Sequence, residues 1–121
     1  MYEIKYVQQR QGERLRRWFT DDYWDLFIWI EETGEISEFQ LCYGKPNEER
    51  ALDWNRNRGY RHSKVSESSS GRIGPSMETP ILVQDGLFSK ETTTERFLND
   101  STGIDPKVRD FVHQKIRDFD L

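Results

Sequence analysis

Cysteine, histidine and long apolar runs are scarce in this sequence. Cys42 is the single cysteine, which excludes a disulfide within the chain and a metal site built on several thiolates. His62 and His113 are the only histidines and lack metal-ligand spacing, so we expect neither a metal site nor a cofactor. No stretch approaches the roughly 18 apolar residues of a membrane helix, and the first residues lack the apolar run of a signal peptide. We therefore expect a cytoplasmic protein that has no membrane partner.

Alanine is almost absent as well, since Ala51 is its only instance, and this disfavours long helices. Hydrophobic residues make up 34% of the chain and the mean hydropathy is −0.93, values low for a globular protein. The chain nevertheless contains 7 Phe, 5 Tyr and 4 Trp, which argues against disorder because large rings bury much apolar area. Its 121 residues suit one domain spanning 1–121, with a core built on aromatic rings.

Basic and acidic side chains are nearly equal in number. The chain has 18 basic and 22 acidic side chains, for a net charge of −4. This balance argues against nucleic acid as a partner and leaves a small anionic ligand to a local basic patch.

Alternating apolar residues make residues 1–65 strand-rich. Short strands are expected at residues 2–7 and 15–19, and the strongest pattern, Trp24–Ile30, predicts a central strand. A polar, glycine-containing connection of hairpin length follows, and Ile36–Tyr43 is the expected partner strand. This hairpin is the best-defined local feature of the sequence.

The next segment admits two interpretations, because Asn47 could cap a short helix while residues 50–54 also alternate as a strand does. We favour a strand, followed by a turn and an antiparallel strand over residues 60–65. Residues 66–79 are rich in serine and glycine and predict a flexible loop.

Residues 80–121 predict a short strand at 80–83 and then two helices. Thr92 and Glu95 match a capping box for the first helix, and Asp105 followed by Pro106 predicts the start of the second. The second helix carries an apolar stripe that includes Phe111 and Ile116. The sequence thus predicts an α+β fold: an antiparallel meander of about five or six strands with two C-terminal helices packed on one face.

The central hairpin is apolar on both faces, yet the helices can cover only one. Trp24, Leu26 and Ile28 share one face, while Phe27 and Trp29 share the other. The uncovered face must meet another surface, which predicts a binding or self-association module and a homodimer. Trp29, Phe27 and Tyr43 are the candidate contact residues.

Two other functions remain open. The basic turn 56–64 suits weak binding of a nucleotide or RNA, and His62 could be the general base of a small enzyme with a polar pocket on the sheet. Whether the chain is an enzyme stays undecided, and no catalytic residue is assigned. The candidate ligand-binding residues are Gln40, Tyr43, Arg50, Trp54, Arg58, Arg61 and His62.

The runs Arg17-Trp18-Phe19, Asp25-Leu26-Phe27-Ile28-Trp29, Phe39-Gln40-Leu41-Cys42-Tyr43 and Glu49-Arg50-Ala51-Leu52-x-Trp54 resemble a small bacterial protein family of unknown function. The resemblance covers about the first two thirds of the chain. It implies a bacterial, cytoplasmic origin and assigns no activity or catalytic residue.

Overall fold

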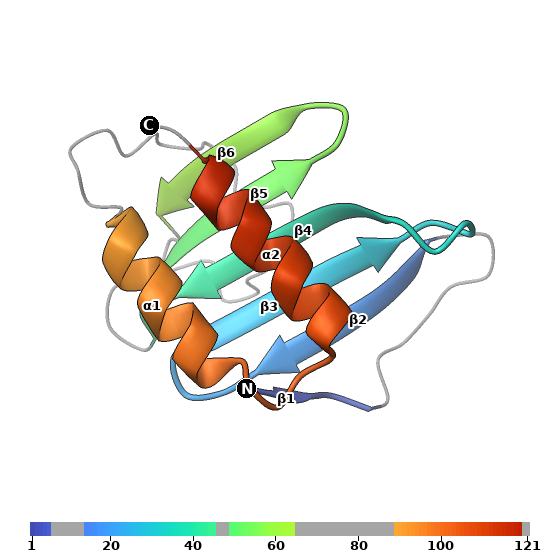
Figure 1. Cartoon of the computed structure of the whole chain (residues 1–121). Coiled ribbons are helices and arrows are strands. Elements are labelled where there is room, and N and C mark those ends of the chain that lie inside the picture. Colours follow the sequence, from blue (N-terminus) through green and yellow to red (C-terminus); the bar gives the residue numbers. More distant parts are fainter. Residues whose placement is uncertain (6–13, 46–48, 65–88, 120–121) are drawn as a thin grey trace.

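An antiparallel sheet and two helices lying across one of its faces make up the fold of this computed structural model (Figure 1). The structure describes residues 1–5, 14–45, 49–64 and 89–119. Its strands are β1 (Tyr2–Glu3), β2 (Leu15–Thr20), β3 (Trp24–Ile30), β4 (Ile36–Tyr43), β5 (Arg50–Asn55) and β6 (Gly59–Lys64). The helices are α1 (Lys90–Asp100) and α2 (Pro106–Asp118).

The strands form a simple meander. Within the described residues, the six-stranded sheet has the order β1-β2-β3-β4-β5-β6, so each strand pairs with its neighbours in the chain. Tight connections make this possible: Gly34 in the β3–β4 turn and Gly59 at the start of β6 have φ angles of 95° and 83°, which glycine adopts readily. The predicted α+β class, the meander and the two C-terminal helices are confirmed.

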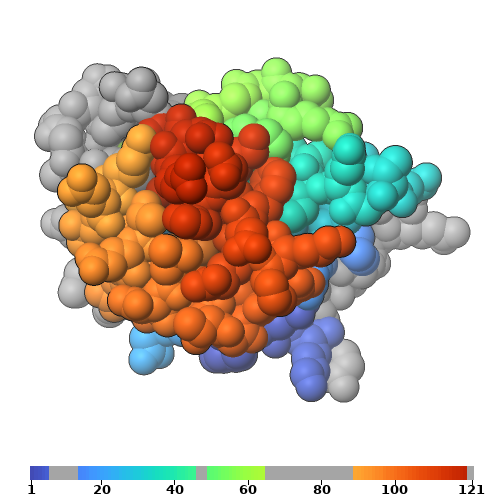
Figure 2. Space-filling view, viewed as in Figure 1, coloured from blue at the N-terminus to red at the C-terminus, as the bar shows by residue number. Residues whose placement is uncertain are grey.

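The core lies between the helices and the face of the sheet that they cover, and Figure 2 shows both helices spread over that face. Leu26, Leu41 and Leu52 occupy one cross-strand row of it, and all are 0% exposed. From the helices, Val112 and Ile116 are also fully buried. Side chains alternate across a strand, so the same strands present a different set of residues on the other side.

The start of α1 differs from the sequence prediction. Its N-cap is Ser89, whose hydroxyl accepts a hydrogen bond from the Thr92 backbone N–H, so the capping box at Thr92 was wrong. Thr92 lies inside the first turn, where its N–H is one of the donors that a cap satisfies. The predicted start of α2 is confirmed, because Asp105 is its N-cap and Pro106 its first residue.

Other local predictions have different outcomes. Residues 50–55 form a strand, so the helical alternative capped by Asn47 was wrong. Strand β1 ends at Glu3, within the longer strand expected over residues 2–7. The flexible loop predicted at 66–79 and the strand predicted at 80–83 lie outside the described residues.

Removing the cap of α2 should destabilise the protein. The Asp105 carboxylate accepts a hydrogen bond from the Lys107 N–H at 2.9 Å and also contacts Arg17 at 3.0 Å. These contacts lower the pKa of Asp105, since they favour its charged form. We expect Asp105→Ala to lower the free energy of unfolding by about 1 kcal/mol in urea titrations. Asp110→Ala, at an exposed position of the same helix, is the matched control; an equal loss there would contradict a capping role.

Candidate functional site

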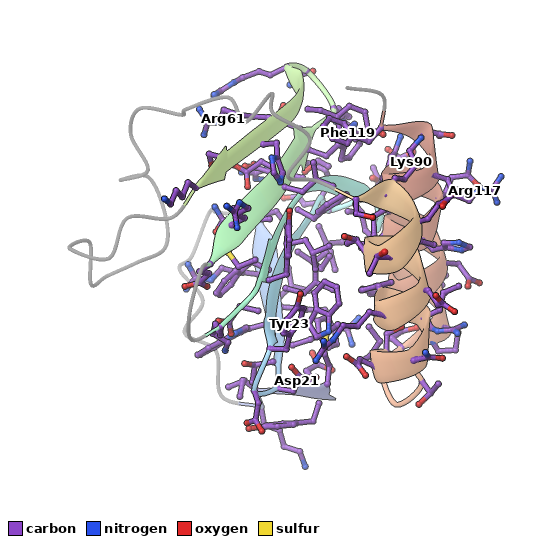
Figure 3. The ribbon with its side chains drawn as sticks, turned by 90° about the vertical axis from the view of Figure 1, so that its left-hand side faces the viewer. Asp21, Tyr23, Arg61, Lys90, Arg117 and Phe119 are labelled. Atoms are coloured by element: carbon purple, nitrogen blue, oxygen red, sulfur yellow. The ribbon has the colours of Figure 1, made fainter. Side chains whose placement is uncertain are left out.

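The two faces of the sheet have different environments. We call the side covered by α1 and α2 the helix face and the opposite side the far face. Strand alternation and the pairing register place the following residues on the far face: Tyr2, Arg16, Trp18, Thr20, Asp25, Phe27, Trp29, Glu38, Gln40, Cys42, Ala51, Asp53, Asn55, Arg61 and Ser63. Figure 3 shows the layers from the side, with Arg61 turned away from the helices and Phe119 between the sheet and α2.

Aromatic rings gather on the far face of β1, β2 and β3. We call Tyr2, Trp18, Phe27 and Trp29 the aromatic strip. Trp18 and Phe27 are cross-strand partners whose ring centroids lie 5.5 Å apart with an interplanar angle of 21°, and Phe27 lies 6.5 Å from Trp29. Tyr2 is 61% exposed and the other rings are half-buried. Trp18, Phe27 and Trp29 therefore form a continuous row of rings that is partly in contact with solvent, and Tyr2 lies on the same face of the sheet.

A polar network fixes the position of Trp18 in this strip. The Trp18 Nε1–H donates to Asp25 Oδ1 at 2.9 Å, and the Thr20 hydroxyl donates to the same oxygen at 2.7 Å. The second Asp25 oxygen pairs with Lys45 Nζ at 2.9 Å. Because Asp25 is satisfied from several sides, the indole is held in one orientation before any partner arrives. Such preorganisation reduces the entropy lost on binding.

Three cations of the far face, Arg14, Lys45 and Arg61, are paired with acids. Arg14 contacts Glu38 at 3.0 Å and also lies over the Trp29 ring, with its Cζ atom 5.9 Å from the ring centroid. Arg61 lies 3.5 Å from Asp53. Together with Lys45 and Asp25, these pairs surround the aromatic rings with compensated charge, which offers little attraction to a polyanion.

Asp53 is the far-face carboxylate whose pKa departs most clearly from its ordinary value. Its side chain is 16% exposed, with Gln40 opposite on β4 and Arg61 opposite on β6. Burial raises the pKa of Asp53 to about 6, and the favourable contacts with Arg61 and Gln40 only partly oppose this effect. A neutral Asp53 carboxyl is therefore accessible just below neutral pH.

This buried carboxylate should make stability depend on pH. The pKa of Asp53 is raised in the folded state, so the folded chain keeps the Asp53 proton over the window from about pH 4 to 6, where the unfolded chain loses it. The contribution of Asp53 to the free energy of unfolding is fully present below about pH 4. It falls by up to about 3 kcal/mol as the pH rises through that window. We expect Asp53→Asn to remove that slope and to stabilise the protein at pH 7.5.

Urea titrations at several pH values measure this effect, with Asp110→Asn as the matched control at an exposed helical position. If the free energy of unfolding of Asp53→Asn varies with pH as it does in wild type, Asp53 is not the group that causes the pH dependence.

Cys42 is a structural thiol. It is 6% exposed on the far face of β4, and burial raises its pKa, with Glu49, Asp53 and Asp25 acting in the same direction. The thiolate needed for nucleophilic or redox chemistry is thus disfavoured.

The ligand-binding residues predicted from sequence are divided between the two faces. Gln40 and Arg61 lie on the far face, Arg58 is exposed in the β5–β6 turn, and Tyr43, Arg50, Trp54 and His62 lie on the helix face. Tyr43, also expected at a dimer contact, is 7% exposed beneath the helices and so lies on the covered face. The candidates do not surround one common pocket.

Tyr43 and His62 are two members of this set whose side chains are in direct contact. The Tyr43 hydroxyl and His62 Nε2 are 2.6 Å apart, and His62 is 2% exposed. The Phe119 ring packs near both His62 and Tyr60, at centroid distances of 6.3 and 5.0 Å. Burial raises the pKa of Tyr43, which keeps its hydroxyl protonated. The pair therefore joins β4 and β6 inside the core.

The basic turn carries less net charge than the sequence suggests. Arg56 contacts Glu35 in the β3–β4 turn at 3.1 Å, and Arg61 contacts Asp53. Of these two acids, Glu35 is the one that the sequence does not indicate, because it lies in another turn, 21 positions from Arg56.

Sequence reasoning placed Asp25 on the same face as Phe27 and Trp29, but it missed Tyr2, Trp18 and Lys45 as parts of that surface. The sequence signal that could have revealed this surface is the alternation within β2 and β3, because it places Trp18 beside Phe27 once the two strands are paired.

No family model matches the sequence, and searches of curated proteins and of solved structures found no significant match. Within the described ranges, no group of three or more His, Cys, Asp or Glu side chains could hold a metal ion. Neither helix of the described chain is long and apolar enough to cross a membrane. The functional argument therefore rests on the surface itself.

Proposed function

We propose that this domain is a binding module that self-associates as a homodimer through the aromatic strip on the far face. The observation that carries the proposal is a set of large rings held in place on the side of the sheet opposite the helices. Tryptophan and tyrosine are enriched at the centres of protein interfaces, where they bury large areas with few rotatable bonds. The expected cytoplasmic location belongs to this proposal.

Charge favours a protein partner over a nucleic acid. Among the described residues of this face, Arg14, Lys45 and Arg61 are each paired with an acid, which reduces their attraction for phosphates. A compensated surface also avoids like-charge contacts when it meets its own copy about a twofold axis. A second copy of this chain is therefore the partner that the surface fits best.

The size of the sheet sets the extent of such an interface. Strands lie about 4.8 Å apart and rise about 3.3 Å per residue, so the far face measures about 24 by 20 Å, or about 500 Å² in projection. A stable interface buries about 800 Å² of accessible surface per partner. On this face Cys42, Ala51 and Ser63 are only 6%, 0% and 1% exposed in the single chain, so a second copy meets the open part of the sheet around the aromatic strip.

Sedimentation of the wild-type protein from about 1 to 200 µM tests the proposal directly. We expect the mass to rise from 14.5 kDa to twice that value with increasing concentration. A chain mass that stays at 14.5 kDa throughout would contradict self-association and would make a small ligand or another protein the candidate partner of the strip.

A further inference from the structure

We propose that Asp25 is the positioning residue of the self-association surface: it accepts the Trp18 indole N–H within the chain, so that the ring of Trp18 is what remains for the second copy to contact. This inference rests on the proposed function. It assigns a role in association to a residue that acts through Trp18 and need not touch the partner.

Strand pairing places Asp25 within reach of Trp18. In the β2–β3 pair Thr20 lies opposite Asp25 and Trp18 lies opposite Phe27, so Asp25 and Trp18 are diagonal neighbours on the far face. The Trp18 Nε1–H donates to Asp25 Oδ1 at 2.9 Å, and the indole stacks with Phe27 at a centroid distance of 5.5 Å. A tryptophan side chain has two rotatable side-chain bonds. One contact at the N–H and one at the ring are sufficient to fix both.

Asp25 is itself held in one orientation. The Thr20 hydroxyl donates to Asp25 Oδ1 at 2.7 Å, and Lys45 Nζ pairs with Asp25 Oδ2 at 2.9 Å. Lys45 is fixed in turn, because its backbone N–H donates to the Tyr23 carbonyl oxygen at 3.4 Å. The Asp25 side chain is 17% exposed, and its partners all belong to the same chain. The acceptor for the indole is therefore in place before a second copy arrives.

This hydrogen bond becomes more important when a second copy covers Trp18. In the single chain Trp18 is half-buried, so water can approach its N–H if Asp25 is replaced. A second copy packed on the ring excludes that water, and a buried donor without an acceptor costs more than the hydrogen bond contributed. Loss of Asp25 also releases the ring, whose immobilisation then opposes association. Both effects weaken the dimer, in addition to any effect on the fold.

The same arrangement defines what the second copy must supply opposite Trp18. Because the indole N–H is already bound within the chain, no acceptor is required from the partner at this point. An apolar or aromatic group suits the remaining ring surface. The aromatic strip of a second copy consists of such groups.

Sedimentation equilibrium of wild type, Asp25→Ala, Asp25→Asn and Asp22→Ala tests the proposal. Asp25→Ala removes the acceptor and should raise the dissociation constant about fivefold or more for each copy, or about 25-fold for a symmetric dimer. Asp25→Asn keeps a carbonyl oxygen that can accept the Trp18 N–H, so its dissociation constant should lie closer to wild type than to Asp25→Ala. Asp22→Ala removes an exposed carboxylate between the same two strands and should dimerise as wild type does.

The Trp18 indole N–H gives a second measurement, which does not depend on the dimer. It is made with Trp29→Gln, a chain that lacks one ring of the strip and should be monomeric. In proton–nitrogen correlation spectra the Trp18 Nε1–H should exchange slowly with water in this chain, faster after the further change Asp25→Ala, and slowly again with Asp25→Asn. A general contribution of Asp25 to stability would not give this pattern at one indole. Trp18→Phe identifies the signal by removing it.

An Asp25→Ala dimer as tight as wild type would overturn the positioning role and leave the proposed function standing. Asp25→Asn as weak as Asp25→Ala would overturn it too, because the charge of Asp25 would then be responsible. If Asp25→Ala does not fold, the Trp29→Gln chain decides: slow exchange of the Trp18 N–H supports the proposal, and rapid exchange overturns it. A wild-type chain that is monomeric at every concentration would overturn both proposals.

Discussion

Trp29→Asp is expected to yield a folded monomer. Trp29 lies on the far face of β3, half-buried beside Phe27 and beneath Arg14, so its ring is part of the proposed contact and outside the core beneath the helices. Truncating a tryptophan at an interface centre costs about 2 kcal/mol or more, which weakens dimerisation by at least about thirtyfold. The aspartate adds the cost of burying a charge.

Two further variants separate loss of the interface from loss of the fold. Trp29→Gln removes the ring without placing a negative charge opposite Glu38, its cross-strand partner, and should also be monomeric. Leu15→Gln changes a residue that is 50% exposed on the helix face and should dimerise as wild type does. Sedimentation gives the mass and near-ultraviolet circular dichroism reports the packing. Folded Trp29 variants that dimerise normally would contradict the proposed surface.

Ile116→Ala is expected to cause the largest loss of stability on the second helix. Ile116 is 0% exposed in the core, and truncating a buried isoleucine leaves a cavity that costs about 2 to 5 kcal/mol. This is a large fraction of the roughly 5 to 15 kcal/mol that stabilises a typical domain. Urea titrations measure the change.

Phe111→Ala is the informative comparison on the same helix. Phe111 is half-buried at the edge of the core, where its ring meets Phe39 and Trp54 edge-on at centroid distances of 6.4 and 5.4 Å. Although phenylalanine is the larger residue, its replacement should cost less than that of Ile116, because part of the site is open to water. The reverse order would mean that the helix is rotated relative to the sheet.

Alternation was sufficient to predict the sheet, because it reflects a period imposed by the backbone. Every second residue of Trp24–Ile30 is bulky on the helix face, and the same holds for Phe39, Leu41 and Tyr43 on the next strand. Short polar connections then leave adjacent pairing as the simplest topology. The N-cap of α1 was not predicted correctly, because Ser89 and the threonines at positions 92, 93 and 94 lie within a few residues of one another, and each has a hydroxyl group of the kind that caps helices.

The candidate site was harder to predict, because its residues meet only through strand pairing. One error was avoidable: Gln40 and Tyr43 are three residues apart, and an odd spacing places them on opposite faces of a strand. The contacts of Lys45 with Asp25 and of Arg56 with Glu35 join residues 20 and 21 positions apart, and no local pattern indicates them.

The most direct test of the dimer surface is an isotope-filtered nuclear Overhauser experiment on a mixture of labelled and unlabelled chains at high concentration. It reports only contacts between protons of different copies. The proposed surface predicts intermolecular contacts that involve the rings of Trp18, Phe27 and Trp29, with none to α1 or α2. Intermolecular contacts confined to the helices, or none at all in a sample of twice the chain mass, would contradict the central claim.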